Sequence, residues 1–148
     1  MNVQQLKNEI QAAKHSCQIL KTKKNIEIDT DLDNSIVIEG DSELFLTVWL
    51  NLISNAVKFT DEGGKITVTL KKQNGCAVVS VSDTGCGMTE ATGRRIFEKF
   101  YQGDTSHTVE GNGLGLALVK RIIDITKSRI TVESELGKGS CFTVYIKE

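Results

Sequence analysis

Two glycine-spaced motifs constrain this chain more than any other feature of its sequence. Residues 83–87 read Asp-Thr-Gly-Cys-Gly, and residues 111–116 read Gly-Asn-Gly-Leu-Gly-Leu. Because glycine has no Cβ, it permits tight turns and lets backbone N–H groups approach a ligand closely. The segment between the motifs is polar over residues 102–112. The pattern predicts a site for a large phosphorylated ligand, with the intervening segment as its cover.

Composition indicates one soluble domain. The 148 residues are 39% hydrophobic and 25% charged, and a chain of this length can bury a real core. The net charge of −1 gives no field that would attract nucleic acid or a membrane surface. There is no secretory signal and no apolar run near 18 residues. We therefore expect a single domain, residues 1–148, without nucleic-acid or direct membrane contact.

Cysteine usage indicates a reducing compartment. The four cysteines form no Cys-x-x-Cys pair, and the chain has only two histidines, which argues against a zinc site. Scattered, unpaired cysteines are typical of reduced thiols, so we expect a cytoplasmic domain. The cysteines are Cys17, Cys76, Cys86 and Cys141.

Hydrophobic periodicity predicts interleaved helices and strands. His15 lies off the apolar stripe of the first helix and should be solvated, whereas Thr89 can cap a short helix. Asn74 and Gly75 are a strong hairpin signal. These elements favour an α+β fold, a two-layer sandwich whose mixed, mostly antiparallel sheet carries helices on one face. The predicted helices span residues 4–23, 42–59 and 114–125, and the predicted strands span 26–29, 36–38, 66–70, 77–81, 130–133 and 141–146.

A polar stripe runs along the predicted helix 42–59. Asn51, Asn55 and Lys58 have the spacing i, i+4 and i+7, which puts them on one helical face. Burying amides in an apolar core is costly, so this face should meet a ligand or solvent. An asparagine oxygen can ligate Mg²⁺, and a lysine one turn later could meet a phosphate. A simple solvated face, with Lys58 favoured by the helix dipole, is the alternative.

Each glycine motif also has two interpretations. Asp83 follows an apolar strand, where it can accept a hydrogen bond from an exocyclic amino group or merely form a turn. Residues 111–115 lead into an apolar helix, whose N-terminus suits a phosphate, or they are only a glycine-rich helix start. No strand runs directly into this motif, and no P-loop sequence occurs, so neither a dinucleotide fingerprint nor a Walker motif is present.

Taken together, the motifs resemble the ATP-binding domain of bacterial sensor histidine kinases, a family related to DNA gyrase, a class of heat-shock chaperones and mismatch-repair ATPases. The resemblance covers essentially the whole chain and implies a Bergerat-type ATP-binding fold. The matching segments are Asn51–Thr60 (asparagine box), Asp83–Gly87 (first glycine box), Phe97–Phe100 (phenylalanine box), Gly111–Leu116 (second glycine box) and residues 132–140 (C-terminal strands).

The resemblance implies a role for each motif residue. Asn55 would ligate Mg²⁺, with Asn51 beside it and Lys58 near the phosphates. Asp83 would accept a hydrogen bond from the adenine amino group. Residues from about 101 to 112 would form the ATP lid. The implied ATP-binding residues are Asn51, Asn55, Lys58, Asp83, Gly85, Gly87, Tyr101, Gly111, Gly113, Leu114 and Gly115.

Three positions depart from the family pattern. Hydrolysing relatives carry an acidic residue in place of Asn51, so we expect no acid/base residue here and phosphoryl transfer in preference to hydrolysis. Gln102 stands where many members carry an arginine that contacts phosphate. Thr126-Lys127-Ser128 replaces a common His-Gly-Gly turn.

No histidine of the chain fits the family's phosphoacceptor. His15 is followed by Ser16 rather than by an acid, and His107 lies in the expected lid. We therefore expect a monomeric catalytic portion that binds Mg·ATP. It would donate the γ-phosphoryl group to a histidine on the dimerisation domain of the same or a parent kinase, and act indirectly on a response regulator. The alternatives are an ATP-gated interaction module and a serine kinase of the anti-sigma-factor type.

Overall fold

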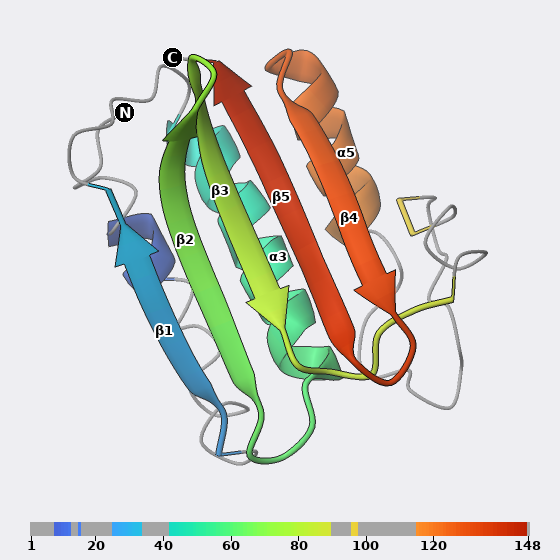
Figure 1. Cartoon of the computed structure of the whole chain (residues 1–148). Coiled ribbons are helices and arrows are strands. Elements are labelled where there is room, and N and C mark those ends of the chain that lie inside the picture. The colour runs from blue at the N-terminus through green and yellow to red at the C-terminus, as the bar shows by residue number, and fades with distance from the viewer. Residues whose placement is uncertain are drawn as a thin grey trace.

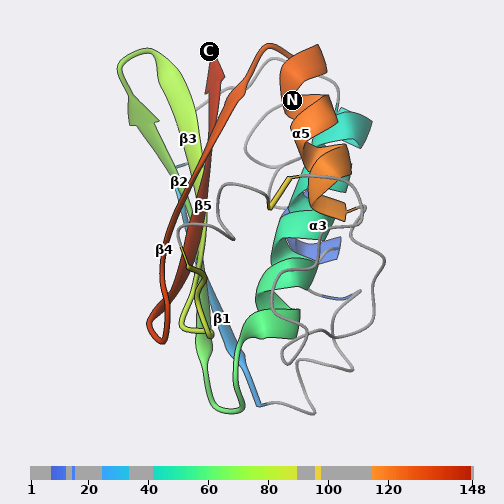
Figure 2. The same cartoon turned by 90° about the vertical axis from the view of Figure 1, so that its right-hand side faces the viewer.

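The described part of the chain folds into one five-stranded sheet with helices on a single face (Figures 1 and 2). The computed structural model describes residues 8–12, 15, 25–33, 42–89, 96–97 and 115–147. The predicted two-layer α+β architecture is confirmed. Among the described residues, no helix is long and apolar enough to cross a lipid bilayer. The elements are β1 (Glu27–Leu32), α3 (Ser42–Phe59), β2 (Lys65–Gln73), β3 (Cys76–Asp83), α5 (Gly115–Ile125), β4 (Arg129–Glu135) and β5 (Gly139–Lys147).

The sheet is mixed, with the strand order β1-β2-β3-β5-β4. Only the β1–β2 pair is parallel, and α3 is part of the connection between these two strands. The β2–β3 hairpin turns at Asn74 and Gly75, whose φ angles are 52° and 76°. Positive φ at both positions is what a two-residue type I′ hairpin requires, so the Asn-Gly prediction is confirmed.

Helix α3 supplies much of the core. It spans Ser42–Phe59, as predicted. Glu43 in its first turn and Lys58 in its last turn both suit the helix dipole. The buried face packs with the inward side chains of the sheet and is at most 3% exposed; it comprises Phe45, Val48, Trp49, Leu52, Ile53, Ala56 and Val57.

The structure covers part of the first predicted helix, and two other predicted elements lie outside it. Residues 8–12 and His15 are helical, and His15 is exposed, as predicted. Residues 8–12 are hereafter the N-terminal helical segment. The remainder of the predicted helix 4–23, the predicted strand 36–38 and the predicted helix after Thr89 lie outside the described residues.

Helix α5 ends in a backbone motif that normally uses glycine. The N–H of Ser128 donates to the carbonyl of Ile123 at 3.0 Å, and the N–H of Lys127 donates to that of Asp124 at 3.2 Å. This pair of bonds defines a Schellman C-cap, in which the residue at the position of Lys127 is left-handed. Its φ is 57°, so a lysine occupies a conformation that glycine adopts more readily.

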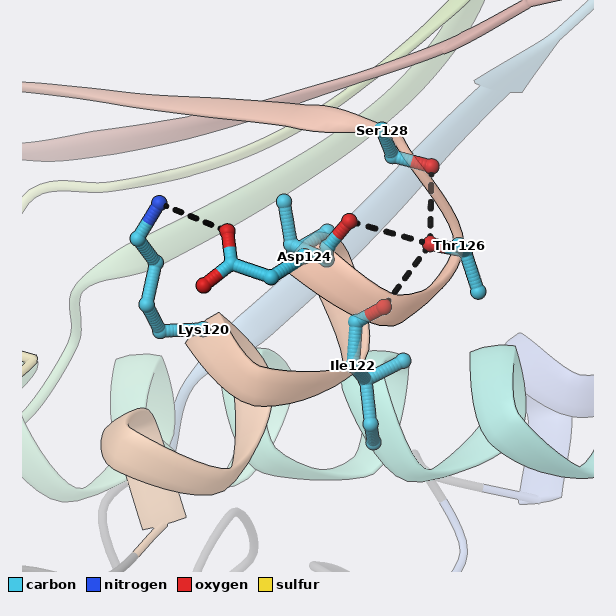
Figure 3. Close-up of polar contacts among 6 residues, drawn as sticks. Lys120, Ile122, Asp124, Thr126 and Ser128 are labelled. Atoms are coloured by element: carbon cyan, nitrogen blue, oxygen red, sulfur yellow. Dashed lines mark hydrogen bonds and ion pairs between the residues drawn. The ribbon is translucent and has the colours of Figure 1, made fainter.

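A threonine hydroxyl reinforces this helix end (Figure 3). Thr126 Oγ1 donates to the Ile122 carbonyl at 2.8 Å and lies 3.0 Å from Ser128 Oγ. The polar residues that replace the family's usual turn thus satisfy helix-end carbonyls with side-chain hydroxyls as well as with backbone N–H groups.

We expect Lys127→Gly to stabilise the protein. Left-handed backbone costs a non-glycine residue roughly 1–2 kcal/mol, and glycine loses about 0.5–1 kcal/mol more entropy on folding. The substitution should raise the free energy of unfolding by about 0.5–1 kcal/mol, measured by urea denaturation. Lys138→Gly is the matched control: Lys138 is also an exposed turn lysine, but its φ is not positive. Lys138→Gly should lower the free energy of unfolding. Equal changes in the two variants would show that the left-handed backbone at Lys127 costs no stability.

Candidate functional site

The first glycine motif lies between two other backbone segments. Cys86 donates its N–H to the carbonyl of Phe59, the last residue of α3, at 3.2 Å. The Cys86 carbonyl accepts from the N–H of Gly137, in the β4–β5 turn, at 2.7 Å. The turn is therefore fixed by backbone on both sides, at the end of the sheet where β3 finishes (Figure 1).

Both glycines of this turn are required by close backbone approach. A Cβ on Gly85 would lie 2.2 Å from the Phe59 carbonyl oxygen. A Cβ on Gly87 would lie 2.0 Å from the carbonyl oxygen of Glu135, and Gly87 also has a φ of 68°. Neither backbone oxygen can move away cheaply, so only glycine fits at these positions.

Asp83, the last residue of β3, is a buried and oriented carboxyl group. It is 9% exposed. Its Oδ1 accepts the N–H of Gly85 at 2.9 Å and that of Ser140 at 3.3 Å. Burial raises the pKa of Asp83, and the two backbone hydrogen bonds oppose this rise. In the described part of the chain no group donates to Oδ2, so a further donor on a ligand would stabilise the carboxylate.

Helix α3 also reaches the second glycine motif. Asn51 donates Nδ2–H to the Thr47 carbonyl at 2.7 Å. A Cβ on Gly115, the first residue of α5, would lie only 2.7 Å from Asn51 Oδ1. The structure thus brings together the asparagine stripe and the end of the second glycine motif, which are far apart in the sequence.

The rest of the asparagine stripe is half-buried. Asn55 and Lys58 are both partly exposed, and Lys58 is in the last turn of α3. Within the described residues, no hydrogen bond uses the Asn55 carboxamide. Its oxygen is a hard ligand of the kind that Mg²⁺ takes beside waters and phosphates, so the site fits this ion.

Several predicted site residues lie outside the described part of the chain. They are Tyr101, Gly111, Gly113, Leu114 and the expected lid, residues 101–112. From the phenylalanine box, Phe97 is described. Its ring meets that of Phe142 edge to face, with centroids 6.3 Å apart, so it packs against β5.

Sequence reasoning missed the part that the β4–β5 hairpin plays in holding the site. Ser140 donates to Asp83, and Ser134 Oγ accepts the N–H of Met88 at 2.7 Å. Gly139 has a φ of 123°, and a Cβ there would lie 2.1 Å from the Asp83 carbonyl oxygen. The glycine-rich turn was visible in the sequence, but no pattern relates it to a motif more than 50 residues away.

Comparison with known proteins identifies the fold. Residues 40–148 match the protein family described as histidine kinase-, DNA gyrase B- and HSP90-like ATPases. The chain belongs to this family. Within the matched range the structure describes Asn51, Asn55, Lys58 and Asp83, together with Gly115 at the start of α5.

The relatives include histidine kinases and a sensor protein. The chain is 40% identical over 124 residues to the circadian input-output histidine kinase CikA of Synechococcus elongatus, a match that covers 82% of this chain and 16% of CikA. It is 37% identical over 131 residues to the heme sensor protein HssS of Staphylococcus saprophyticus, covering 88% of this chain and 28% of HssS. The chain therefore spans a minor part of the curated relatives it matches.

A solved catalytic domain matches over nearly its whole length. The catalytic domain of histidine kinase ThkA is 28% identical, with a TM-score of 0.81, and the match covers 96% of this chain and 91% of that one. ThkA has also been solved in complex with the response regulator protein TrrA.

We expect Gly85→Ala to destabilise the turn through the Phe59 carbonyl. Overpacking against backbone should lower the free energy of unfolding by about 3 kcal/mol, measured by denaturant titration. Gly137→Ala is the control, because Gly137 has a φ of 83° but nothing within 4 Å of its Cβ position. It should cost only about 1 kcal/mol, from backbone strain alone. Equal losses of unfolding free energy in the two variants would show that contact with the Phe59 carbonyl does not determine the effect of Gly85→Ala.

Proposed function

We propose that this domain binds Mg·ATP and donates the γ-phosphoryl group to a histidine on a separate dimerisation domain, in two-component signal transduction. The observation that carries the proposal is the carboxyl group of Asp83. It is buried and held by two backbone N–H groups beside a turn that only glycine can form. Membership of the ATPase family supports the same conclusion.

Asp83 is assigned to adenine. Because burial raises its pKa, the ionised carboxylate is under-solvated, and an exocyclic amino group would supply the missing donor. Oδ1 is already fixed by Gly85 and Ser140, so Oδ2 is the free acceptor. Gly85 and Gly87 shape this side of the pocket, because they let the turn pack directly against the backbone of Phe59 and Glu135.

The face of α3 is assigned to the metal and phosphates. Asn55 would hold Mg²⁺ through its amide oxygen, with Asn51 beside it and Lys58 near the phosphates. When bound, the ion would neutralise phosphate charge. Gly115 begins α5 against Asn51, so the N–H groups at this helix start face the same region and suit an anion. We assign the remaining phosphate contacts to Gly111, Gly113 and Leu114, and the cover to the segment that includes Tyr101.

The chemistry at Asn51 favours transfer over hydrolysis. Its amide nitrogen donates to the Thr47 carbonyl, which fixes the side chain. An amide cannot accept a proton as a general base does, so no group at this position activates water. The domain would act by holding the nucleotide in position and by stabilising charge while an external nucleophile attacks.

The nucleophile is assigned to another domain. His15, the described histidine, is exposed and is followed by Ser16 rather than by an acidic residue. A histidine-containing dimerisation domain would receive the phosphoryl group, and a response regulator would receive it next. The complex of the relative ThkA with TrrA supports a partner of the second kind. Because ATP is a cytoplasmic substrate, we place the domain in the cytoplasm.

Asp83→Asn should weaken ATP binding without unfolding the protein. The asparagine keeps an oxygen for Gly85 and Ser140 but loses the charge that strengthens the hydrogen bond to adenine, a loss of about 10–100-fold in affinity. Isothermal calorimetry with Mg·ATP measures it. Asp61→Asn makes the same change at an exposed position just beyond α3 and should leave the affinity unchanged. Undiminished binding by Asp83→Asn would refute the adenine assignment.

Phosphoryl transfer itself can be tested with labelled ATP. Incubated alone, the chain should acquire no label. When a histidine-containing dimerisation domain from a related kinase is added, that domain should gain phosphate that is labile in acid and stable in base. Asp83→Asn supplies the matched negative control. ATP binding without any transfer would favour the interaction module, and label on serine would favour the serine kinase.

A further inference from the structure

Glu9, a buried acidic residue of the N-terminal helical segment, is not one of the residues assigned to the ATP site. Glu9 is 8% exposed, and its neighbour Ile10 is 1% exposed within the core. The only tryptophan of the chain, Trp49 of α3, donates its Nε1–H to Glu9 Oε2 at 2.9 Å. Trp49 is itself 1% exposed. An acid and its donor are thus enclosed together where the segment meets α3.

The environment of Glu9 favours its neutral form. Burial raises its pKa from 4.5 to about 7, although the Trp49 hydrogen bond and the amino terminus lower it. No lysine, arginine or histidine of the described residues forms an ion pair with Glu9. The charged groups on the elements packed against the segment are Glu43 and Lys58 of α3, and Glu27, Asp29 and Asp31 of β1. The last two of these are paired with Lys65 and Lys71.

The N-terminal helical segment borders β1 as well as α3. Ile10 and Gln11 line a cavity of about 240 Å³ with Thr30, Asp31 and Leu32 of β1. On the other side, Trp49 of α3 donates directly to Glu9, so the protonation state of Glu9 acts on the contact between the segment and α3.

The direction of the pH effect on docking follows from the difference in the pKa of Glu9 between the docked and the free segment. The pKa of Glu9 is higher in the docked segment than in the free one, so docking takes up a proton and is favoured as the pH falls from about 7 toward 4.5. Between pH 8 and pH 6 the docking equilibrium should change about tenfold. This range includes neutral pH, so a small change in pH around 7 has the largest effect on the ionised fraction of Glu9.

We propose that Glu9 and Trp49 form a pH-sensitive contact that docks the N-terminal helical segment onto α3 when Glu9 is protonated and loosens it when Glu9 ionises. Trp49 lies two residues from Asn51 on the same helix, so the contact attaches the segment to the helix that carries the asparagine stripe. The contact itself does not depend on the reaction proposed above.

Hydrogen exchange followed by mass spectrometry tests the contact on the full chain. After correction for intrinsic rates, amides of residues 8–12 should be about tenfold less protected at pH 8 than at pH 6. Glu9→Gln keeps the size and an acceptor oxygen but cannot ionise, so its protection should not depend on pH. His15→Gln is the control, because it changes an exposed residue close to the segment in sequence and leaves Glu9 intact, and it should behave as the unaltered chain. An unchanged pH dependence in Glu9→Gln would overturn the proposal.

A second variant keeps the test decisive if Glu9→Gln folds poorly. Trp49→Phe retains an aromatic ring against Phe45, whose centroid is 5.9 Å from that of Trp49, but removes the donor. Since the Trp49 hydrogen bond lowers the pKa of Glu9, its loss should move the midpoint of the exchange transition to higher pH. A role confined to packing would leave the midpoint in place, and that result would also overturn the proposal.

Tryptophan emission gives an independent readout. In the unaltered chain, the fluorescence of Trp49 should change with a midpoint near pH 7 as the partner of its indole N–H becomes charged. The transition should persist in His15→Gln and disappear in Glu9→Gln. A flat emission profile in the unaltered chain would contradict the contact.

Discussion

Direct contact between backbone segments is the constraint on which this site depends. The turn after β3 lies between the Phe59 carbonyl at the end of α3 and the carbonyls of the β4–β5 hairpin, with no room for a Cβ at Gly85, Gly87 or Gly139. Such contacts are rigid, because peptide units cannot change rotamer as side chains do. They position the backbone N–H groups of Gly85 and Ser140, which hold the carboxyl group of Asp83 through hydrogen bonds.

Helix α3 joins the core to the site. Its inner face is fully apolar, and its other face carries Asn51 against the start of α5. Displacement of the core-facing side would therefore move the proposed ligand-facing side by a similar amount, because a helix is stiff over this length. The same helix holds Trp49, so one rigid element carries the packing of the core, the proposed ligand face and the contact with Glu9.

Local sequence patterns predicted the described helices and strands well. They could not predict the contacts between residues that are far apart in the sequence. Helix α3 and the Asn-Gly hairpin depend on nearby residues, so periodicity and turn chemistry were sufficient. The spacing of Asn51 and Asn55 predicted a shared face for the same reason. The hydrogen bond from Ser140 to Asp83 arises only when β3 and β5 pair, and no local preference encodes that pairing. The burial of Glu9 likewise depends on where the segment packs, which no local pattern encodes.

The pairing of Asp83 with Ser140 has a consequence for biosynthesis. The two residues are separated by 57 positions, and β5 follows β3 in the chain. At roughly 5–20 residues per second, a ribosome adds Ser140 roughly 3–11 s after Asp83. Hairpins close in about 1–10 μs, so the β2–β3 hairpin can form and open many times during that interval, because an isolated hairpin is only marginally stable. The Ser140 hydrogen bond to Asp83 can therefore form only after β5 has been made and has paired with β3.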